Sequence, residues 1–382
     1  MQYKDWQHVR HLLAVRLDDI GDVVMLGPAL RTLKGALPKV QITLLASPEG
    51  AQVAPLLPWV DEVLVHEAVW QSRAAPEDVP IDVEAQVDVI EAIEGRQVDA
   101  AFIFTATGHS PYPAAYLAYL SGVGIRIGQS KEWGGGLLTH WIEPLPDKVH
   151  QVDRNLFLLE QSGLPVAGRQ LELKVPESAR TTARNLLRRL RVPPGEPFVV
   201  IAPGARRPTH RYPARRYAEL CRHLNDRLGM PIVVVGDRAD VPLGGEIVAG
   251  APTGQVASIA GQTSVAELAA VIEQAELVIT NNSAAMHVAD AFRRPTVVLF
   301  AGTELEAQYR PRGAPAKVLR QPTRCAPCHS ATCRYNLECL DIPPAAVADE
   351  ASGLLEVAAQ QRQPTGLLTL PPSPPPSAGE IA

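Results

Sequence analysis

Apolar runs alternate with amphipathic segments along most of this 382-residue chain. Short apolar runs predict buried strands, and apolar residues recurring every three or four positions predict helices. Strands are expected at 12–17, 41–46, 62–65, 99–104, 124–128, 171–175, 198–202, 232–236, 277–280 and 296–300. Helices are expected between them, at 28–37, 112–120, 154–161, 178–190, 214–228, 265–274 and 284–292. This strand–helix rhythm is typical of a mostly parallel α/β sheet.

The rhythm is interrupted between residues 149 and 176, which separates two α/β halves of similar size. We therefore expect a first Rossmann-like domain over 1–175 and a second over 176–362, facing each other across a cleft that would be a natural ligand site. Residues 363–382 contain a proline-rich tract and are expected to form a disordered tail.

Composition narrows the class of protein. An apolar fraction of 46% allows two sizeable cores, and the net charge of −5 gives no support for a nucleic-acid partner. The sequence has no stretch near the roughly 20 apolar residues that span a bilayer, and no apolar region typical of a signal peptide follows its first residues. A cytoplasmic location is expected, and peripheral contact with the inner membrane stays open.

The turn after the first predicted strand gathers ionisable side chains. It reads Arg16-Leu17-Asp18-Asp19-Ile20-Gly21-Asp22 and leads directly into a helix-like segment. In an open parallel sheet, ligands bind at the carboxyl ends of strands. A carboxylate held there can act as a general base. The turn contains neither the G-x-G-x-x-G dinucleotide motif nor a P-loop.

Four of the five cysteines crowd into fifteen residues near the C-terminus, and Cys221 lies alone in a predicted helix. The cluster is Cys325, Cys328, Cys333 and Cys339. The first pair has chelating spacing, whereas the second pair is spaced more loosely than in a standard zinc knuckle. A structural zinc ion, a disulfide and reduced thiols all stay open.

Five segments in a fixed order carry a resemblance to glycosyltransferase family 9, the family of the ADP-heptose:lipopolysaccharide heptosyltransferases. They are 16–22 with 27–31, 202–205 with 210–213, 261–264 before Glu267, 280–289, and 325–328. Each segment is modest alone, but the ordered set is specific and spans roughly residues 10 to 350.

The resemblance implies a GT-B fold, with an N-terminal acceptor domain, a C-terminal nucleotide-sugar domain and an active site in the cleft between them. It implies inverting, metal-independent transfer of a sugar such as heptose. The donor would be a nucleoside-diphosphate sugar such as ADP-heptose, and the acceptor a lipopolysaccharide or another envelope glycan. Two alternatives stay open: a nucleotide-sugar epimerase on the same fold, and a non-catalytic sugar-nucleotide-binding protein.

On the acceptor side, Asp22 falls at the family's catalytic aspartate. The competing interpretation is that Asp22 merely caps the next helix, since aspartate is a favoured cap. Arg16 is expected to pair with Asp22 or to contact an anionic acceptor. Asp18 and Asp19 are expected to be solvated loop residues or acceptor contacts, and Gly21 to border the acceptor.

On the donor side, the resemblance implies that the loop after the strand at 198–202 reaches the donor phosphates. His210 stands where relatives often carry a lysine, so Arg206 or Arg211 could supply the positive charge instead. The alternative is a solvated basic loop. Thr263 precedes a capping box formed by Ser264 and Glu267, and the resemblance places that loop beside the donor.

The segment 280–289 predicts a buried strand followed by a helix whose first turn would hold the donor diphosphate. Free N–H groups and the helix dipole favour an anion there. The expected donor contacts are Asn282, Ser283, Ala284, Ala285 and His287. Asn282 and Ala284 replace an acid and a glycine that are common in relatives, which leaves the sugar specificity open. Capping by Asn282 or Ser283 is compatible with phosphate binding.

Overall fold

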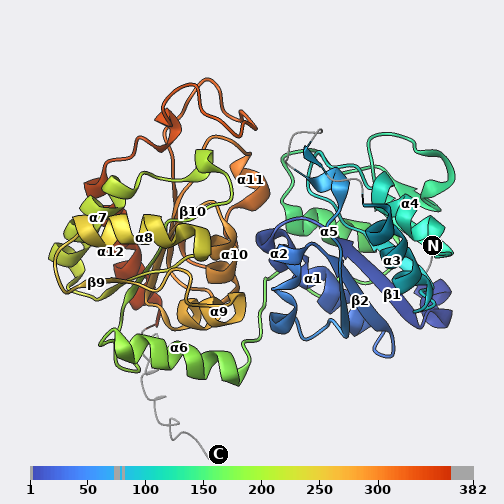
Figure 1. The fold of residues 1–382 in the computed structure, drawn as a ribbon, viewed down its shortest axis with the longest axis horizontal. Coiled ribbons are helices and arrows are strands. Elements are labelled where there is room, and N and C mark those ends of the chain that lie inside the picture. The colour runs from blue at the N-terminus through green and yellow to red at the C-terminus, as the bar shows by residue number, and fades with distance from the viewer. Residues whose placement is uncertain (1–2, 73–77, 80–81, 363–382) are drawn as a thin grey trace, which may run out of the picture.

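The computed structural model describes residues 3–72, 78–79 and 82–362, and the predicted proline-rich tail lies outside these residues. Two parallel six-stranded sheets, each flanked by helices, stand side by side (Figure 1). The two-domain α/β architecture expected from the alternating pattern is therefore present. The division at residues 175 and 176 stays a prediction, with α6 (Glu177–Arg189) packing against α9 (Val265–Gln274) of the second half.

The two sheets have the same topology. The first runs β3-β2-β1-β4-β5-β6, and the second, read from its far edge, runs β9-β8-β7-β10-β11-β12. In both sheets the strand order reverses beside the first strand, between β1 and β4 and between β7 and β10. Ligands in open α/β sheets bind at such switch points.

All strand pairs of the two sheets are parallel. The first sheet consists of β1 (His11–Arg16), β2 (Gln41–Ala46), β3 (Glu62–Val65), β4 (Ala100–Ile103), β5 (Ile125–Gln129) and β6 (His140–Ile142). The second consists of β7 (Val199–Ala202), β8 (Ile232–Val234), β9 (Val256–Ser258), β10 (Leu277–Asn281), β11 (Thr296–Leu299) and β12 (Ala316–Leu319).

The remaining described α-helices are α1 (Ile20–Ala36), α2 (Pro48–Ala51), α3 (Val83–Glu94), α4 (Tyr112–Leu120), α5 (Gln151–Gln161), α7 (Ala214–Leu228), α8 (Val241–Gly250), α10 (Ala284–Ala291), α11 (Glu306–Tyr309) and α12 (Pro344–Arg362). Helices cover both faces of each sheet, so the central strands are buried throughout. Such strands read as continuous apolar runs, which is why the sequence located them well.

One predicted strand is wrong, and three strands of the structure were missed. Residues 171–175 form no strand: the backbone N–H of Lys174 donates to the carbonyl of Leu56 in an isolated contact. The strands β6, β9 and β12 were not predicted. Each is a short edge strand with partly exposed side chains, so none produces the apolar run on which the prediction relied.

The two domains touch through α1 and α10 and through polar contacts around them. Gln308 Nε2 donates to the carbonyl of Asp147 at 2.5 Å, and Arg312 pairs with Asp153 at 3.0 Å.

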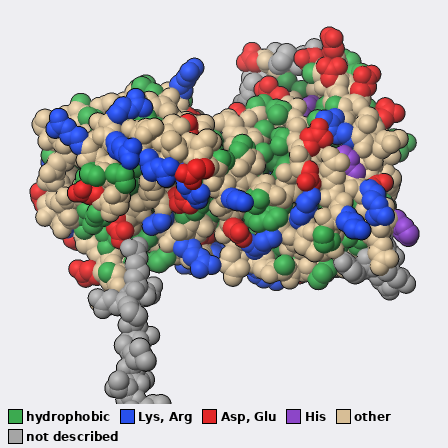
Figure 2. Space-filling view, turned by 90° about the horizontal axis from the view of Figure 1, so that it is seen from below, with side chains coloured by type: hydrophobic (Ala, Val, Ile, Leu, Met, Phe, Trp, Pro, Cys, Tyr) green, Lys and Arg blue, Asp and Glu red, His purple; other side chains and the backbone are tan. Residues whose placement is uncertain are grey.

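Basic and acidic side chains are interspersed on the face in Figure 2. No helix among the described residues is both long and apolar enough to cross a membrane.

Candidate active site

The turn after β1 holds a buried cluster of charges at the first switch point. Arg16 is completely buried, and its guanidinium bridges two carboxylates: Nε lies 3.0 Å from Asp18 Oδ2 and Nη2 lies 2.6 Å from Asp22 Oδ1. Burial acts to lower the pKa of Arg16, but Asp18 and Asp22 raise it overall. Of the two roles expected for Arg16, the structure shows the pairing with Asp22.

Asp22 stands in the first turn of α1. One carboxylate oxygen accepts from Arg16, and the other accepts from the backbone N–H of Asp19 at 3.3 Å. The capping role considered as an alternative is therefore present, although it does not exclude catalysis. Burial raises the pKa of Asp22 above its ordinary value, which makes its ionised form a stronger base.

Asp18 is not the solvated loop residue that the sequence suggested. It is only 7% exposed, and it pairs with Arg16 through one oxygen and with His109 Nδ1, 2.9 Å away, through the other. Burial acts to raise the pKa of Asp18, but Arg16 and His109 lower it overall. The solvated alternative was wrong because the loop after β4, which contacts Asp18, lies far along the chain, and the role of Asp18 as an acceptor contact stays a prediction.

The second switch point faces this turn from the other domain. Arg206, in the loop after β7, forms an ion pair with Asp19 across the domain boundary. Gly21 lies against His287 of α10: a Cβ at Gly21 would sit 2.9 Å from His287 Cδ2. The predicted acceptor turn and the predicted donor helix are therefore in direct contact.

The N-terminus of α10 has no side-chain cap. The hydroxyl of its N-cap residue, Ser283, lies 3.1 Å from Thr280 Oγ1 instead of bonding the helix backbone. Ala284 and Ala285 follow with small side chains. This end of the helix is therefore suited to an anion, with backbone N–H groups and the helix dipole directed at it.

His210 and Asn282 lie next to the N-terminus of α10 and form a hydrogen bond with each other. The Nδ1 atom of His210 is 3.3 Å from Asn282 Nδ2, and its Nε2 is 2.6 Å from Thr303 Oγ1. Asn282 also accepts from the backbone N–H of Ala301 at 3.0 Å and donates to Glu304 at 3.3 Å. Both side chains are buried, so their observed partners are protein groups, and their contact with a donor stays a prediction.

The remaining predicted donor residues differ in what they contact. Arg211 turns back on its own loop, with Nε donating to the carbonyl of Ala205 at 2.7 Å. The hydroxyl of Thr263 is buried and has no hydrogen-bond partner among the described residues. His287 is buried and neutral, because burial lowers its pKa to about 3. Among the arginines of this loop, Arg206 is the one that reaches the acceptor turn.

The four clustered cysteines, Cys325, Cys328, Cys333 and Cys339, surround one small cavity and are present as thiols. Within the part of the chain that the structure describes, no group of three or more His, Cys, Asp or Glu side chains is placed to hold a metal ion. The four side chains are free thiols in the structure, and the structural zinc site stays a prediction. Thr303 lines the same cavity as the four cysteines.

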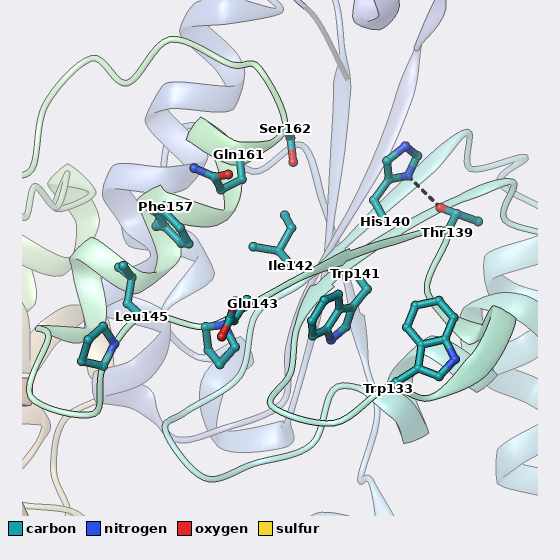
Figure 3. Close-up of a pocket in the computed structure, with 12 residues that line it drawn as sticks. Trp133, Thr139, His140, Trp141, Ile142, Glu143, Leu145, Phe157, Gln161 and Ser162 are labelled. Atoms are coloured by element: carbon teal, nitrogen blue, oxygen red, sulfur yellow. Dashed lines mark hydrogen bonds between the residues drawn. The ribbon is translucent and has the colours of Figure 1, made fainter.

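A separate groove of about 710 Å³ lies beside the edge strand β6 (Figure 3). The rings of Trp133 and Trp141 meet edge to face at 6.1 Å, and Phe157 of α5 lines the other side. Nothing in the sequence patterns pointed to this groove, because β6 itself was not predicted.

Comparison with known proteins agrees with this geometry. The model of glycosyltransferase family 9 (heptosyltransferase) matches residues 94–338. The chain belongs to glycosyltransferase family 9. Lipopolysaccharide heptosyltransferase 2 of Escherichia coli K12 is 26% identical over 351 residues, covering 88% of this chain and 96% of that protein. The protein is accordingly a glycosyltransferase.

Solved structures of the family share the fold. The family 9 glycosyltransferase of Veillonella parvula superposes with a TM-score of 0.78 at 22% identity, covering 94% of this chain and 98% of that one. The ADP-heptose lipopolysaccharide heptosyltransferase II of E. coli gives a TM-score of 0.72 at 24% identity, covering 91% and 99%. The GT-B fold expected from the resemblance is confirmed. At these identities the likeness concerns the fold alone.

Proposed function

We propose that this glycosyltransferase transfers heptose from ADP-heptose to a lipopolysaccharide or another envelope glycan, with inversion at the anomeric carbon. The family and a lipopolysaccharide heptosyltransferase among the relatives support the proposal, and ADP-heptose is in the name of a solved structure with the same fold. Its acceptor would lie at the inner face of the membrane, with the protein in peripheral contact.

One observation carries the proposal: Gly21, next to the proposed base, packs against His287 of the proposed donor helix. We infer that the two switch points form the two walls of one site. A donor diphosphate at the N-terminus of α10 would place its sugar toward Asp22. An acceptor hydroxyl entering from the first domain would then lie between the carboxylate and the sugar.

In the proposed reaction, Asp22 takes the proton of the acceptor hydroxyl as that oxygen attacks the anomeric carbon. The bond between this carbon and the diphosphate oxygen breaks, and the electron pair leaves with ADP. Negative charge grows on the diphosphate, where the N–H groups of Ala284 and Ala285 and the guanidinium of Arg206 would stabilise it. Arg206 and the N-terminus of α10 would compensate the negative charge of the diphosphate, so the proposed transfer uses no metal.

The departures from the family pattern act on the donor side. Asn282 is neutral, and its partners already include His210 and Glu304. We infer that Asn282 shapes the loop beneath the donor sugar and leaves electrostatic stabilisation to Arg206. Arg206 would then exchange Asp19 for donor phosphate when the donor binds, since both are anions that compete for one guanidinium.

The test is transfer and donor binding by Asp22→Asn, which keeps the size of the side chain and removes its basicity. We expect a loss of transfer of about 10²–10⁴-fold, the usual contribution of a general base, with ADP-heptose affinity within a few-fold of wild type. Asp349→Asn, in an exposed ion pair with Arg227, is the matched control. Transfer by Asp22→Asn at the wild-type rate would remove Asp22 as the base. Product formation without any acceptor would indicate the epimerase.

A further inference from the structure

The loop after β4 brings an unassigned histidine to the charge cluster of the site. His109 Nδ1 lies 2.9 Å from Asp18 Oδ1, and a backbone hydrogen bond from Ala106 in the same loop also reaches the Asp18 carboxylate. The side chain of His109 is 47% exposed, and its Nε2 has no hydrogen-bond partner among the described residues. His109 is thus anchored at the first switch point through Asp18, which also pairs with Arg16, the partner of Asp22.

Without His109, the cluster of Arg16, Asp18 and Asp22 carries a net negative charge. Arg16 supplies one positive charge to two carboxylates, those of Asp18 and Asp22, and all three are held within 3.0 Å contacts. A protonated His109 adds the second positive charge and brings the sum to zero. The hydrogen bond to Asp18 raises the pKa of His109 above its ordinary value, which favours this protonated form.

Other charged or ionisable groups surround the pair. Arg16 comes from the end of β1, Asp18 and Asp19 from the turn after it, and Asp22 from α1. Across the domain boundary lie Arg206 of the loop after β7 and Tyr309 of α11. Arg206 is already paired with Asp19. Histidine is the side chain whose ordinary pKa lies nearest to neutral pH, and in His109 the hydrogen bond to Asp18 raises that pKa.

We propose that His109, acting through Asp18, is a positioning residue that keeps Asp22 ionised on the acid side of the working pH range. The inference rests on the proposed role of Asp22 as the base. An Asp22 that binds a proton cannot accept one from the acceptor, so any nearby cation that lowers its proton affinity extends activity to lower pH. Arg16 lowers the proton affinity of Asp22 directly, and His109 adds its charge through Asp18.

The direction of the effect follows from charge. Replacing His109 by a neutral side chain removes a cation near Asp22, so the pKa of Asp22 rises. The acid limb of the transfer rate then moves to higher pH, by about 0.5–1 unit for one charge several ångströms away at an effective dielectric constant of ~20–40. Well above that limb Asp22 is ionised in either protein, and the rates converge.

The experiment measures kcat against pH for wild type, His109→Asn and His109→Lys. Asparagine can still hydrogen-bond Asp18 but has no charge, and lysine restores the charge. His223→Asn is the control, because His223 also pairs with a carboxylate, Glu219, on the surface of α7. We expect the acid limb of His109→Asn to move up by about 0.5–1 pH unit, that of His109→Lys to stay near wild type, and His223→Asn to change nothing.

Two results would overturn the inference. An unmoved acid limb in His109→Asn, with kcat unchanged, would show that the charge of His109 does not reach Asp22. A loss of more than about 100-fold at every pH would instead make His109 a proton acceptor in its own right. Both results leave the proposed function to its own test, because only the Asp22→Asn measurement decides whether Asp22 is the base.

Discussion

Replacement of Arg16 tests the central electrostatic feature of the site. The guanidinium of Arg16 is fully buried and compensates Asp18 and Asp22 at once. In Arg16→Met the aliphatic side chain fills similar space, but both carboxylates lose their shared partner. Removing one member of a buried ion pair costs about 3–5 kcal/mol. We expect a total loss in this range, and not twice as much for two ion pairs, because one carboxylate can take up a proton and Asp18 keeps its hydrogen bond to His109.

This cost predicts a clear change in thermal stability. For a domain of 150–250 residues, 1 kcal/mol corresponds to about 2–4 °C in melting temperature, so Arg16→Met should melt about 6–20 °C below wild type at pH 7–8. Arg16→Lys should lose less, since it keeps the charge without the two-sided fork. Arg184→Met removes an exposed pair with Glu177 and should change stability by at most about 1 kcal/mol.

The difference in stability between wild type and Arg16→Met should also depend on pH. In wild type the pKa of Asp18 is lowered below 3.8, so its contribution is present above that value and is lost as the pH falls through the lowered folded-state pKa. Without Arg16 the carboxylates bind protons more readily and become neutral at a higher pH. The gap between wild type and Arg16→Met should therefore shrink between pH 7 and pH 4. A gap below about 1 kcal/mol, or one that does not change with pH, would refute the ion-pair argument.

Three further predictions concern other parts of the structure. Gly21→Val should reduce transfer at least about 10-fold, because the new side chain would press on His287. The control is Gly35→Ala, where no atom lies within 4 Å of the new Cβ and α1 should gain about 0.5–1 kcal/mol. A fully active Gly21→Val would show that the two walls can separate freely. Because the pKa of His287 is lowered to about 3, the folded state loses stability as the pH falls from 6.5 toward 3, and acid unfolding of His287→Asn should begin at lower pH than in wild type. A thiol reagent should modify exposed Cys328 before unfolding and Cys221 only after it, since burial raises the pKa of Cys221 to about 12; early reaction of Cys221 would contradict its burial.

The sequence located most of the fold because a parallel strand covered by helices on both sides must be apolar at every position. The strands β2 and β3 and the helices α4, α7 and α9 were predicted to the residue. Three of the four edge strands, β6, β9 and β12, escaped because their partly exposed positions break the apolar run, whereas the edge strand β3 keeps three apolar residues in a row. Within the site, Asp22 and Ser283 could be singled out because each lies in a family motif that follows a buried strand, at the start of the next helix.

What the sequence alone determined, then, is a set of reactive turns at strand ends: Arg16 to Asp22 in one half and Asn282 to His287 in the other. Only the tertiary structure decided which of them meet. Identical strand orders in the two sheets bring both turns to matching switch points, and the facing domains press Gly21 against His287. The same crossover topology sets β4 beside β1 and so delivers His109 to Asp18. A lone histidine in a Thr-Gly-His loop carries no signal of its own, because its role depends on a partner that is distant along the chain.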